Sequence, residues 1–354
     1  MIGARVRVLV VEDSATVRER LCAALASHPG FELVGEAADG PTAIALCRAL
    51  RPDVVTLDLV LPGMSGLAVT EFVMAWCPTP ILVVSAATNR GEVVQTMDAL
   101  QAGAVDVLEK PTGEEPEGAW EATFLSAVRM VARIKVITHP RARLGLRTTR
   151  EPAPSEPAPS DPARRVVAIG ASTGGPAAVL HVLRDLGAGF PLPILVVIHI
   201  GAVFAPGLVA WLDTNAPMPV LFAVDGTPLE QLRGHAVLAP ADVHLTVERG
   251  RVRLSDAPER HSCRPSVDVL FASLAVDDGP GTVAALLTGM GRDGAEGLLA
   301  VRQGGGATIA QDEATSVVFG MPREAILRSA AEHVLPLDRI GGVVSGLVAR
   351  RRVR

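Results

Sequence analysis

Short apolar runs rich in β-branched residues alternate along the chain with segments in which apolar residues recur every three or four positions. Runs of the first kind are typical of buried strands, and spacing of the second kind predicts amphipathic helices. Their alternation predicts an α/β fold in which helices cover both faces of a mainly parallel sheet. In the amino-terminal part, strands are expected at 6–11, 32–36, 53–58, 80–85 and 105–109. In the carboxy-terminal part they are expected at 166–170, 194–199, 220–223, 236–239, 282–288 and 307–310, with an added antiparallel hairpin of 245–247 and 252–254.

A tract of proline, alanine and acidic residues at 151–163 interrupts this alternation. Proline lacks a backbone donor and favours extended polyproline II, so the tract is not expected to join a core. We therefore expect a first domain at 1–130, a second domain at 165–347, and a linker at 131–164 that includes the end of an interdomain helix. The arginine-rich residues 348–354 are expected to form a solvated basic tail.

Composition narrows the class of protein. The chain has 354 residues, 49% of them hydrophobic, which is enough for two domains with real cores. A net charge of −5 gives no general attraction toward nucleic acid or acidic lipid. The start of the chain does not resemble a signal peptide, and the apolar runs are too short to span a membrane. We expect a soluble, monomeric cytoplasmic protein that neither binds nucleic acid nor inserts into the membrane.

The four cysteines are scattered and show no CxxC spacing. They are Cys22, Cys47, Cys77 and Cys263. This distribution argues against a disulfide framework or a zinc site and is typical of a reducing cytosol.

Charged side chains follow several strands of the first predicted sheet. Glu12 and Asp13 come after the first strand, Asp58 after the third, and Lys110 after the fifth, while Ser85 ends the fourth. Ligands bind at the carboxyl ends of parallel strands, and clustered carboxylates are suited to Mg²⁺. A carboxylate beside Mg²⁺ and a lysine can act as nucleophile toward a phosphoryl group. Each residue alone could be an ordinary exposed charge or a helix-start acid, but their joint placement favours a phosphoryl-accepting site.

Three segments extend this interpretation to a family. They are VVEDS at 10–14, LDLVLPGM at 57–64 and EKP at 109–111. Together they resemble the receiver domain of two-component response regulators over residues 1 to about 130. Val107 departs from the pattern, since many receivers carry an aromatic switch residue at that position.

The resemblance implies a flavodoxin-like fold with a five-stranded parallel sheet. It also implies phosphorylation of Asp58 by a histidine kinase of the chemotaxis type, with Mg²⁺ held by Glu12, Asp13 and Asp58. Ser85 is then the switch hydroxyl, and Lys110 contacts the phosphoryl group.

A glycine-rich turn opens the second predicted domain. Ser172 lies between the strand at 166–170 and a helix that Pro176 is expected to begin, where amides and the helix dipole can stabilise an oxyanion. The turn spells G-x-S-x-G, the pattern of a nucleophile elbow. Two other interpretations stay open at this point, a dinucleotide-binding turn and a tight turn whose serine caps the helix.

A nucleophilic serine needs a base and an acid that orients the base. Among the histidines of this domain, only His199 ends a strongly apolar strand run, next to the expected position of Ser172. Asp293 follows the strand at 282–288 and is the candidate acid. It could instead cap the next helix, with Glu296 completing a capping box. The order Ser, His, Asp differs from that of α/β-hydrolases.

Four segments of the second domain carry a second resemblance. They are IGASTGGP at 169–176, RPSVDVLF at 264–271, LTGMGRDGA at 287–295 and QDEATSVVFGMPREAI at 311–326. They closely resemble the chemotaxis protein-glutamate methylesterase family, known as CheB, over about 165–347. The fold implied is a doubly wound, mainly parallel α/β domain with an added hairpin.

This likeness implies hydrolysis of glutamate methyl esters on chemoreceptors, with release of methanol, and deamidation of receptor glutamines. Ser172 is then the nucleophile, His199 the general base and Asp293 its orienter, while Thr173 and Met290 line the site and its oxyanion region. No cofactor is expected in this domain. We further expect the unphosphorylated receiver to cover the mouth of the serine site and phosphorylation to open it.

Two departures and two rival functions remain. Ile200 and Gly201 follow His199 where the family has Met-Pro, and Cys263 stands where a histidine often precedes the RPSVD segment. One rival is a non-catalytic signalling module that binds receptors or drains phosphate through Asp58. The other is a nucleotide-dependent enzyme at the glycine turn.

Overall fold

The computed structural model describes residues 5–86, 90–113, 115–134, 136 and 164–349. They form two compact units that divide between Thr149 and Arg150, each with its own sheet and core. Among the described residues, no helix combines the length and the apolar character that a membrane crossing requires.

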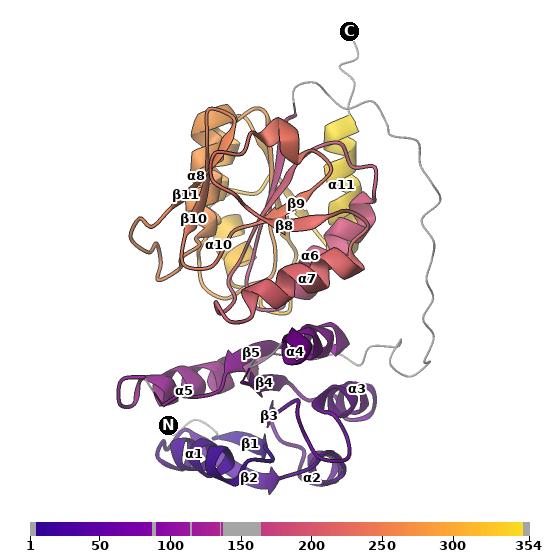
Figure 1. Ribbon diagram of the computed structural model, residues 1–354, viewed down its shortest axis with the longest axis vertical. Helices are drawn as coiled ribbons and strands as arrows, with labels where there is room; N and C mark the ends of the chain where they lie inside the picture. The colour runs from indigo at the N-terminus through magenta and orange to yellow at the C-terminus, as the bar shows by residue number, and fades with distance from the viewer. Residues whose placement is uncertain (1–4, 87–89, 114, 135, 137–163, 350–354) are drawn as a thin grey trace. The chain divides into compact units, whose positions relative to one another are not determined.

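The first unit is built on a five-stranded parallel sheet (Figure 1). Its strands are β1 (Val6–Val11), β2 (Phe31–Ala37), β3 (Val54–Leu57), β4 (Ile81–Ser85) and β5 (Asp106–Glu109). The order is β2-β1-β3-β4-β5, so the chain runs from β1 to one side and then returns to β3 on the other. This reversal is a topological switch point, and it lies where the predicted acidic residues are.

Helices cover both faces of this sheet. They are α1 (Ala15–Ala26), α2 (Gly40–Leu50), α3 (Gly66–Trp76), α4 (Arg90–Ala102) and α5 (Ala119–Val131). Helix α1 packs beside α5, and α3 packs between α2 and α4. Ser14, Asp39 and Ser65 begin α1, α2 and α3 by accepting an amide hydrogen bond, as N-cap side chains do.

The second unit contains a seven-stranded, wholly parallel sheet in the order β14-β13-β12-β6-β7-β9-β8. The strands are β6 (Val166–Ala171), β7 (Ile194–Ile198), β8 (Val220–Phe222), β9 (Ala236–Leu238), β12 (Thr282–Leu286), β13 (Ala307–Gln311) and β14 (His333–Leu335). From β6 the chain runs first toward β7 and later returns to β12 on the other side. The switch point of this sheet therefore follows β6.

Helices cover this sheet on two sides, with α6 and α11 on one side and α8 and α10 on the other (Figure 1). They are α6 (Gly175–Leu186), α7 (Ala205–Asn215), α8 (Val267–Asp278), α9 (Ala295–Gln303), α10 (Met321–Leu327) and α11 (Leu337–Ala349). A short 3-10 helix spans Leu229–Leu232. The core between sheet and helices buries Val197, Leu286 and Phe271.

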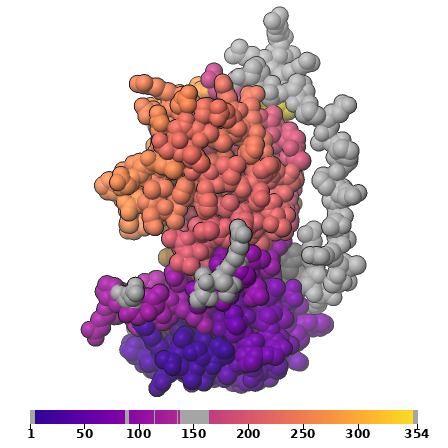
Figure 2. All heavy atoms as spheres, viewed as in Figure 1, coloured from indigo at the N-terminus to yellow at the C-terminus, as the bar shows by residue number. Residues whose placement is uncertain are grey.

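The predicted hairpin is formed by β10 (His244–Glu248) and β11 (Arg251–Ser255). Arg249 and Gly250 both have positive φ, as a two-residue hairpin turn requires. The hairpin packs on α8, where the amide of Val247 donates to Oγ of Ser273 at 3.0 Å. In Figure 2 this part of the chain lies within the orange surface on one side of the second unit.

The predicted fold class is confirmed, and the differences are local. The sequence pattern does not predict β14, which begins at His333. This edge strand has only three residues, which is too short for an alternation of apolar and polar positions to be recognised. Strand β12 ends at Leu286 rather than at 288, and α11 continues to Ala349, beyond the expected boundary at 347.

Candidate functional sites

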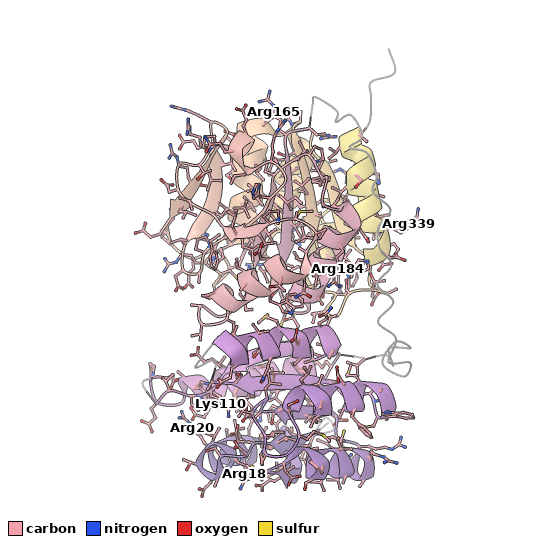
Figure 3. The ribbon with its side chains drawn as sticks, turned by 45° about the vertical axis from the view of Figure 1, so that its right-hand side comes forward. Arg18, Arg20, Lys110, Arg165, Arg184 and Arg339 are labelled. Atoms are coloured by element: carbon pink, nitrogen blue, oxygen red, sulfur yellow. The ribbon has the colours of Figure 1, made fainter. Side chains whose placement is uncertain are left out.

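The predicted acidic and basic residues of the first domain lie at one edge of its sheet. Lys110, labelled in Figure 3, places Nζ 2.9 Å from Oε1 of Glu12 and 2.9 Å from Oδ2 of Asp58. Its backbone amide donates to the carbonyl oxygen of Ser85 at 2.9 Å. Asp13 is exposed beside them. The structure therefore brings together side chains that are up to 98 positions apart in the chain.

Burial and charge compete in this cluster. Loss of hydration raises the pKa of Glu12 and of Asp58, and the bonds from Lys110 only partly oppose this. Burial acts to lower the pKa of Lys110, but Glu12 and Asp58 outweigh it and raise that pKa. Two buried carboxylates thus face one ammonium group, which leaves an excess of negative charge.

The cluster fits a hard divalent cation. Oε2 of Glu12 is buried and has no hydrogen-bond partner among the described residues. Oxygen atoms of Glu12, Asp13 and Asp58 lie within 4.8 Å of one another. Carboxylate oxygens are the ligands that Mg²⁺ prefers, so the residues present are suited to the ion that the sequence predicts.

In the second domain, three adjacent strands bring the predicted catalytic residues to one edge. Ser172 follows β6, His199 follows β7, and the loop at 288–293 follows β12. The amide of His199 donates to the carbonyl of Ala171 at 3.1 Å, and the amide of Ser172 donates to the carbonyl of Thr288 at 3.0 Å. Ser172, His199 and Asp293 thus lie at the switch point of the sheet, where open α/β sheets bind their ligands.

The turn that carries Ser172 is tightly packed. Its next residues lead into α6 through Gly174, which has φ of 75° and makes no side-chain capping bond. Ser172 is therefore not the side-chain cap of this helix. A β carbon added at Gly289 would lie 2.8 Å from Cβ of Ser172, closer than real side chains allow. Gly289, in the loop after β12, is therefore packed directly against Ser172.

Thr173 and Met290 flank Ser172 on the same edge. Thr173 is buried, and its carbonyl oxygen accepts a hydrogen bond from Oγ1 of Thr288 at 2.9 Å. Met290 follows Gly289 and is 54% exposed, so its side chain lies at the surface of the loop.

Asp293 is buried and accepts four hydrogen bonds. Its Oδ1 accepts from Oγ of Ser266 at 2.7 Å and from the amide of Asp268 at 3.1 Å. Its Oδ2 accepts from the amide of Val267 at 2.7 Å and contacts Nε2 of His199 at 2.9 Å. Ser266 is the N-cap of α8, so the carboxylate lies against the positive end of that helix.

The alternative role for Asp293, as the cap of α9, is not what the structure has. Gly294 occupies the N-cap position of α9 and makes no side-chain capping bond. Glu296 forms an ion pair with Arg260 at 2.7 Å. The aspartate is thus engaged with α8 and with His199.

The electrostatics of the pair favour opposite charges. Burial acts to raise the pKa of Asp293, but the bonds from His199, Ser266 and Val267 outweigh it and lower that pKa. Burial acts to lower the pKa of His199, but Asp293 and Cys263 outweigh it and raise that pKa to about 9. Because Nε2 faces the carboxylate, Nδ1 is the ring nitrogen that remains for proton transfer.

Two residues that sequence reasoning did not single out position the serine turn. The side chain of Thr288 donates to the carbonyl of Thr173 and accepts from the amide of Val318 at 2.9 Å. Gln311 is fully buried, and its Oε1 accepts from the amide of Thr288 at 2.8 Å. Both lie inside the segments that carry the family resemblance, but nothing in the local pattern marks them as positioning residues.

Cys263 is a further residue that was noted only as a departure. Its Sγ lies 3.9 Å from Nδ1 of His199 and 3.4 Å from the carbonyl oxygen of His261. The two residues are 64 positions apart in the chain. No sequence spacing indicates this contact, because the loop before α8 produces it.

One domain has acidic residues and a lysine at its switch point, and the next has a serine, a histidine and an aspartate at one sheet edge, which together are features of a receiver-linked hydrolase. The model of the response regulator receiver domain matches residues 8–116, and that of the CheB methylesterase matches residues 167–344. The chain belongs to the CheB methylesterase family, and it is a methylesterase with a response regulator receiver domain.

Similar proteins support this assignment over nearly the whole chain. A protein-glutamate methylesterase/protein-glutamine glutaminase of Anaeromyxobacter dehalogenans is 46% identical over 335 residues, 95% of each chain. One from Geobacter metallireducens is 43% identical over 98% of this chain and 100% of its own. The crystal structure of the Thermotoga maritima CheB methylesterase catalytic domain covers 52% of this chain and 99% of its own, with 36% identity and a TM-score of 0.50.

Proposed function

We propose that this chain removes methyl esters from glutamate side chains of chemoreceptors and deamidates receptor glutamines, under the control of phosphorylation at Asp58. The observation that carries the hydrolytic part is the bond between His199 and Asp293 beside the strand end of Ser172. That arrangement supplies a nucleophile, a base and an acid at one edge of the sheet.

In the first half of the proposed reaction, Nδ1 of His199 removes the hydroxyl proton of Ser172. The serine oxygen attacks the ester carbonyl carbon, and the bond to methoxide breaks as the histidine returns the proton, so methanol leaves. Asp293 remains ionised and stabilises the imidazolium that forms. The amino-terminal end of α6 stabilises the oxyanion, with Thr173 and Met290 lining this region.

In the second half, water attacks the acyl-serine and gives a proton to His199. Collapse of the intermediate releases the glutamate carboxyl group and restores the Ser172 hydroxyl as the histidine returns the proton. A glutamine side chain passes through the same acyl-enzyme, because it differs only in having ammonia as the leaving group. One set of residues can therefore catalyse both reactions.

The receiver residues support the regulatory part of the proposal. Asp58 offers the carboxylate oxygen that a histidine kinase phosphorylates, and Lys110 is placed to contact the phosphoryl group. Mg²⁺, when held by Glu12, Asp13 and Asp58, neutralises negative charge on the phosphoryl oxygens. Ser85 is the switch hydroxyl. Phosphorylation then shifts the chain from a less active to a more active population.

Methanol release from methylated receptor membranes tests this proposal. Wild type and Asp58→Asn are compared with and without a small-molecule phosphodonor and Mg²⁺. We expect the phosphodonor to accelerate methanol release by the wild type and to leave the variant unchanged. Equal wild-type rates in both conditions would contradict phosphorylation control.

Receptors that carry glutamine at the modified positions provide the second substrate. Ammonia release is expected to respond to the phosphodonor in parallel with methanol release, since both reactions use one site. A protein that binds receptors but releases neither product would instead be the non-catalytic signalling module.

A further inference from the structure

The contact between Cys263 and His199 creates a pair of metal-binding atoms inside the hydrolase site. The Sγ and Nδ1 atoms are 3.9 Å apart, and both side chains are partly buried. The other ring nitrogen, Nε2, faces Oδ2 of Asp293 at 2.9 Å. Donor atoms of these three residues lie within 4.8 Å of one another.

The distance suits a tetrahedral zinc ion. Zinc–sulfur bonds of about 2.3 Å and zinc–nitrogen bonds of about 2.0 Å place the two ligand atoms about 3.5 Å apart at a tetrahedral angle. The thiol and the ring therefore need to approach each other by only a few tenths of an ångström. Thiol sulfur and imidazole nitrogen are also the donors that select zinc over magnesium.

The surroundings of His199 are those of a metal-binding histidine. Such a histidine usually donates its second ring N–H to a carboxylate, which fixes the tautomer and makes the free nitrogen a better ligand. Asp293 is that carboxylate, and α8 holds it through the amides of Val267 and Asp268 and the hydroxyl of Ser266. The orientation of the ring toward an ion thus needs no rearrangement.

The thiol is held by a separate element. The amide of Cys263 donates to the carbonyl of Arg260 at 2.9 Å, and the amide of Arg260 donates back at 3.2 Å. Arg260 is anchored in turn by its ion pair with Glu296. The turn at 260–263 therefore presents the sulfur at the end of β7, where His199 lies, without depending on that strand for its own shape.

We propose that His199 and Cys263 bind a soft divalent cation, with Zn²⁺ as the probe, and that the bound ion inhibits hydrolysis. The thiol proton passes to solvent on binding, and water completes the coordination. Inhibition follows because the ion occupies Nδ1, the nitrogen that must accept the serine proton. The binding itself depends only on the described geometry and does not require the proposed receptor substrate.

Direct binding is measured first, on full-length protein with Mg²⁺ in excess to fill the receiver carboxylates. Equilibrium dialysis with Zn²⁺ compares wild type with Cys263→Ser, and Cys47→Ser serves as the matched control. Cys47 is the relevant control because its Sγ lies 3.9 Å from Sγ of Cys77, which forms a second thiol pair. We expect one zinc ion fewer on Cys263→Ser, whereas Cys47→Ser keeps the ion bound at His199.

Inhibition is measured next with a simple methyl ester, and each variant is scaled to its own zinc-free rate. Zinc is expected to inhibit wild type and Cys47→Ser reversibly, with EDTA restoring the rate. Loss of one ligand is expected to raise the inhibitory concentration for Cys263→Ser at least about tenfold. Co²⁺ gives an independent readout, because the part of the thiolate-to-cobalt absorption that Cys263 contributes should be lost in Cys263→Ser and kept in Cys47→Ser.

Equal zinc binding by wild type and Cys263→Ser would overturn the proposal, and so would binding without inhibition. If the serine variant melts at a lower temperature than wild type, Cys263→Ala replaces it in the same assays. A wild type that binds zinc here but releases no methanol from receptors would refute the proposed function and leave the metal site intact.

Discussion

Nε2 of His199 lies 2.9 Å from Oδ2 of Asp293, and the same carboxylate receives three further hydrogen bonds from the start of α8. Helix α8 thus fixes the carboxylate of Asp293, and this carboxylate fixes the imidazole ring of His199. Because Nε2 is engaged with the carboxylate, Nδ1 is the ring nitrogen left for proton transfer.

Replacement of Asp293 by asparagine removes the negative charge of the side chain and keeps its size, so it distinguishes the contributions of the two. Asparagine keeps the size of the side chain but cannot stabilise the imidazolium, so kcat for methanol release is expected to fall by about 10³–10⁴-fold. The amide also cannot accept all the bonds from α8, and the free energy of unfolding should drop by about 1–3 kcal/mol. Steady-state kinetics and urea denaturation check the two effects, with exposed Asp256→Asn as control. A kcat within tenfold of wild type would exclude Asp293 as the orienting acid.

The pH profile should report the raised pKa of His199. Only the neutral ring can accept the serine proton, so kcat is expected to rise with pH through an apparent pKa above the ordinary 6.5 and toward about 9. Asp293 and Cys263 are the groups that raise this value, and removing the thiol in Cys263→Ala should move the limb to lower pH. The rates are measured with EDTA present to exclude bound metal. An apparent pKa near the ordinary 6.5 in both wild type and Cys263→Ala would show that neither Asp293 nor Cys263 raises the pKa of His199.

The same shift has a consequence for stability. Because the pKa of His199 is higher in the folded chain than in the unfolded chain, its protonation stabilises the fold fully below about pH 6.5. That contribution is lost as the pH rises from 6.5 toward 9. Thermal melts of wild type and His199→Gln across this range should therefore converge at high pH.

A methyl group at Gly289 should damage the serine turn. The added carbon would lie 2.8 Å from Cβ of Ser172 and 2.3 Å from Sδ of Met321, so one of them must move. We expect Gly289→Ala to reduce kcat by at least about tenfold, since displacements of about 1 Å are costly in active sites. Gly346→Ala is the matched control, because that helical position has open space and the change should be neutral or stabilising by up to about 1 kcal/mol. Equal activity in the two variants would show that the loop does not constrain the serine.

The receiver cluster predicts a dependence on Lys110. Its removal in Lys110→Met leaves Glu12 and Asp58 buried without their cation, and stability should fall by about 3 kcal/mol at pH 7 without Mg²⁺. Mg²⁺ should then raise the melting temperature of the variant more than that of wild type. Arg20→Met removes a partly exposed pair with Glu121 and the contact of Arg20 with the Trp120 ring, but it leaves no carboxylate fully buried, so it should cost less than the loss of Lys110. Identical Mg²⁺ responses would argue against an ion bound by these carboxylates.

Much of the architecture could be predicted because the pattern of apolar residues indicates where the strands end. Apolar runs of four to six residues marked the central strands, and the residue after each run marked the carboxyl edge of the sheet. Ser172, His199, Glu12 and Asp58 all follow such runs. Parallel strands place their ends together, so separate positions in the sequence became one site.

The remaining contacts could not be predicted because they are made by loops and buried amides. Asp293 accepts hydrogen bonds from the first amides of α8, a helix that begins 26 residues earlier in the chain. These bonds can be predicted only when the position of that helix is known. The side-chain oxygen of Gln311 accepts a hydrogen bond from the amide of Thr288, 23 residues away, and the thiol of Cys263 contacts His199, 64 residues away. Such pairings carry no periodic signal, since they depend on how two loops pack at the sheet edge.

The rate of methanol release by Ser172→Ala decides whether Ser172 is the nucleophile. Methylated receptor membranes and phosphodonor are supplied to wild type and variant at equal concentrations, with thermal melts to establish that both are folded. Removal of the nucleophile predicts a rate lower by about a thousandfold or more. A folded Ser172→Ala protein that releases methanol within tenfold of the wild-type rate would contradict the assignment of Ser172 as the nucleophile.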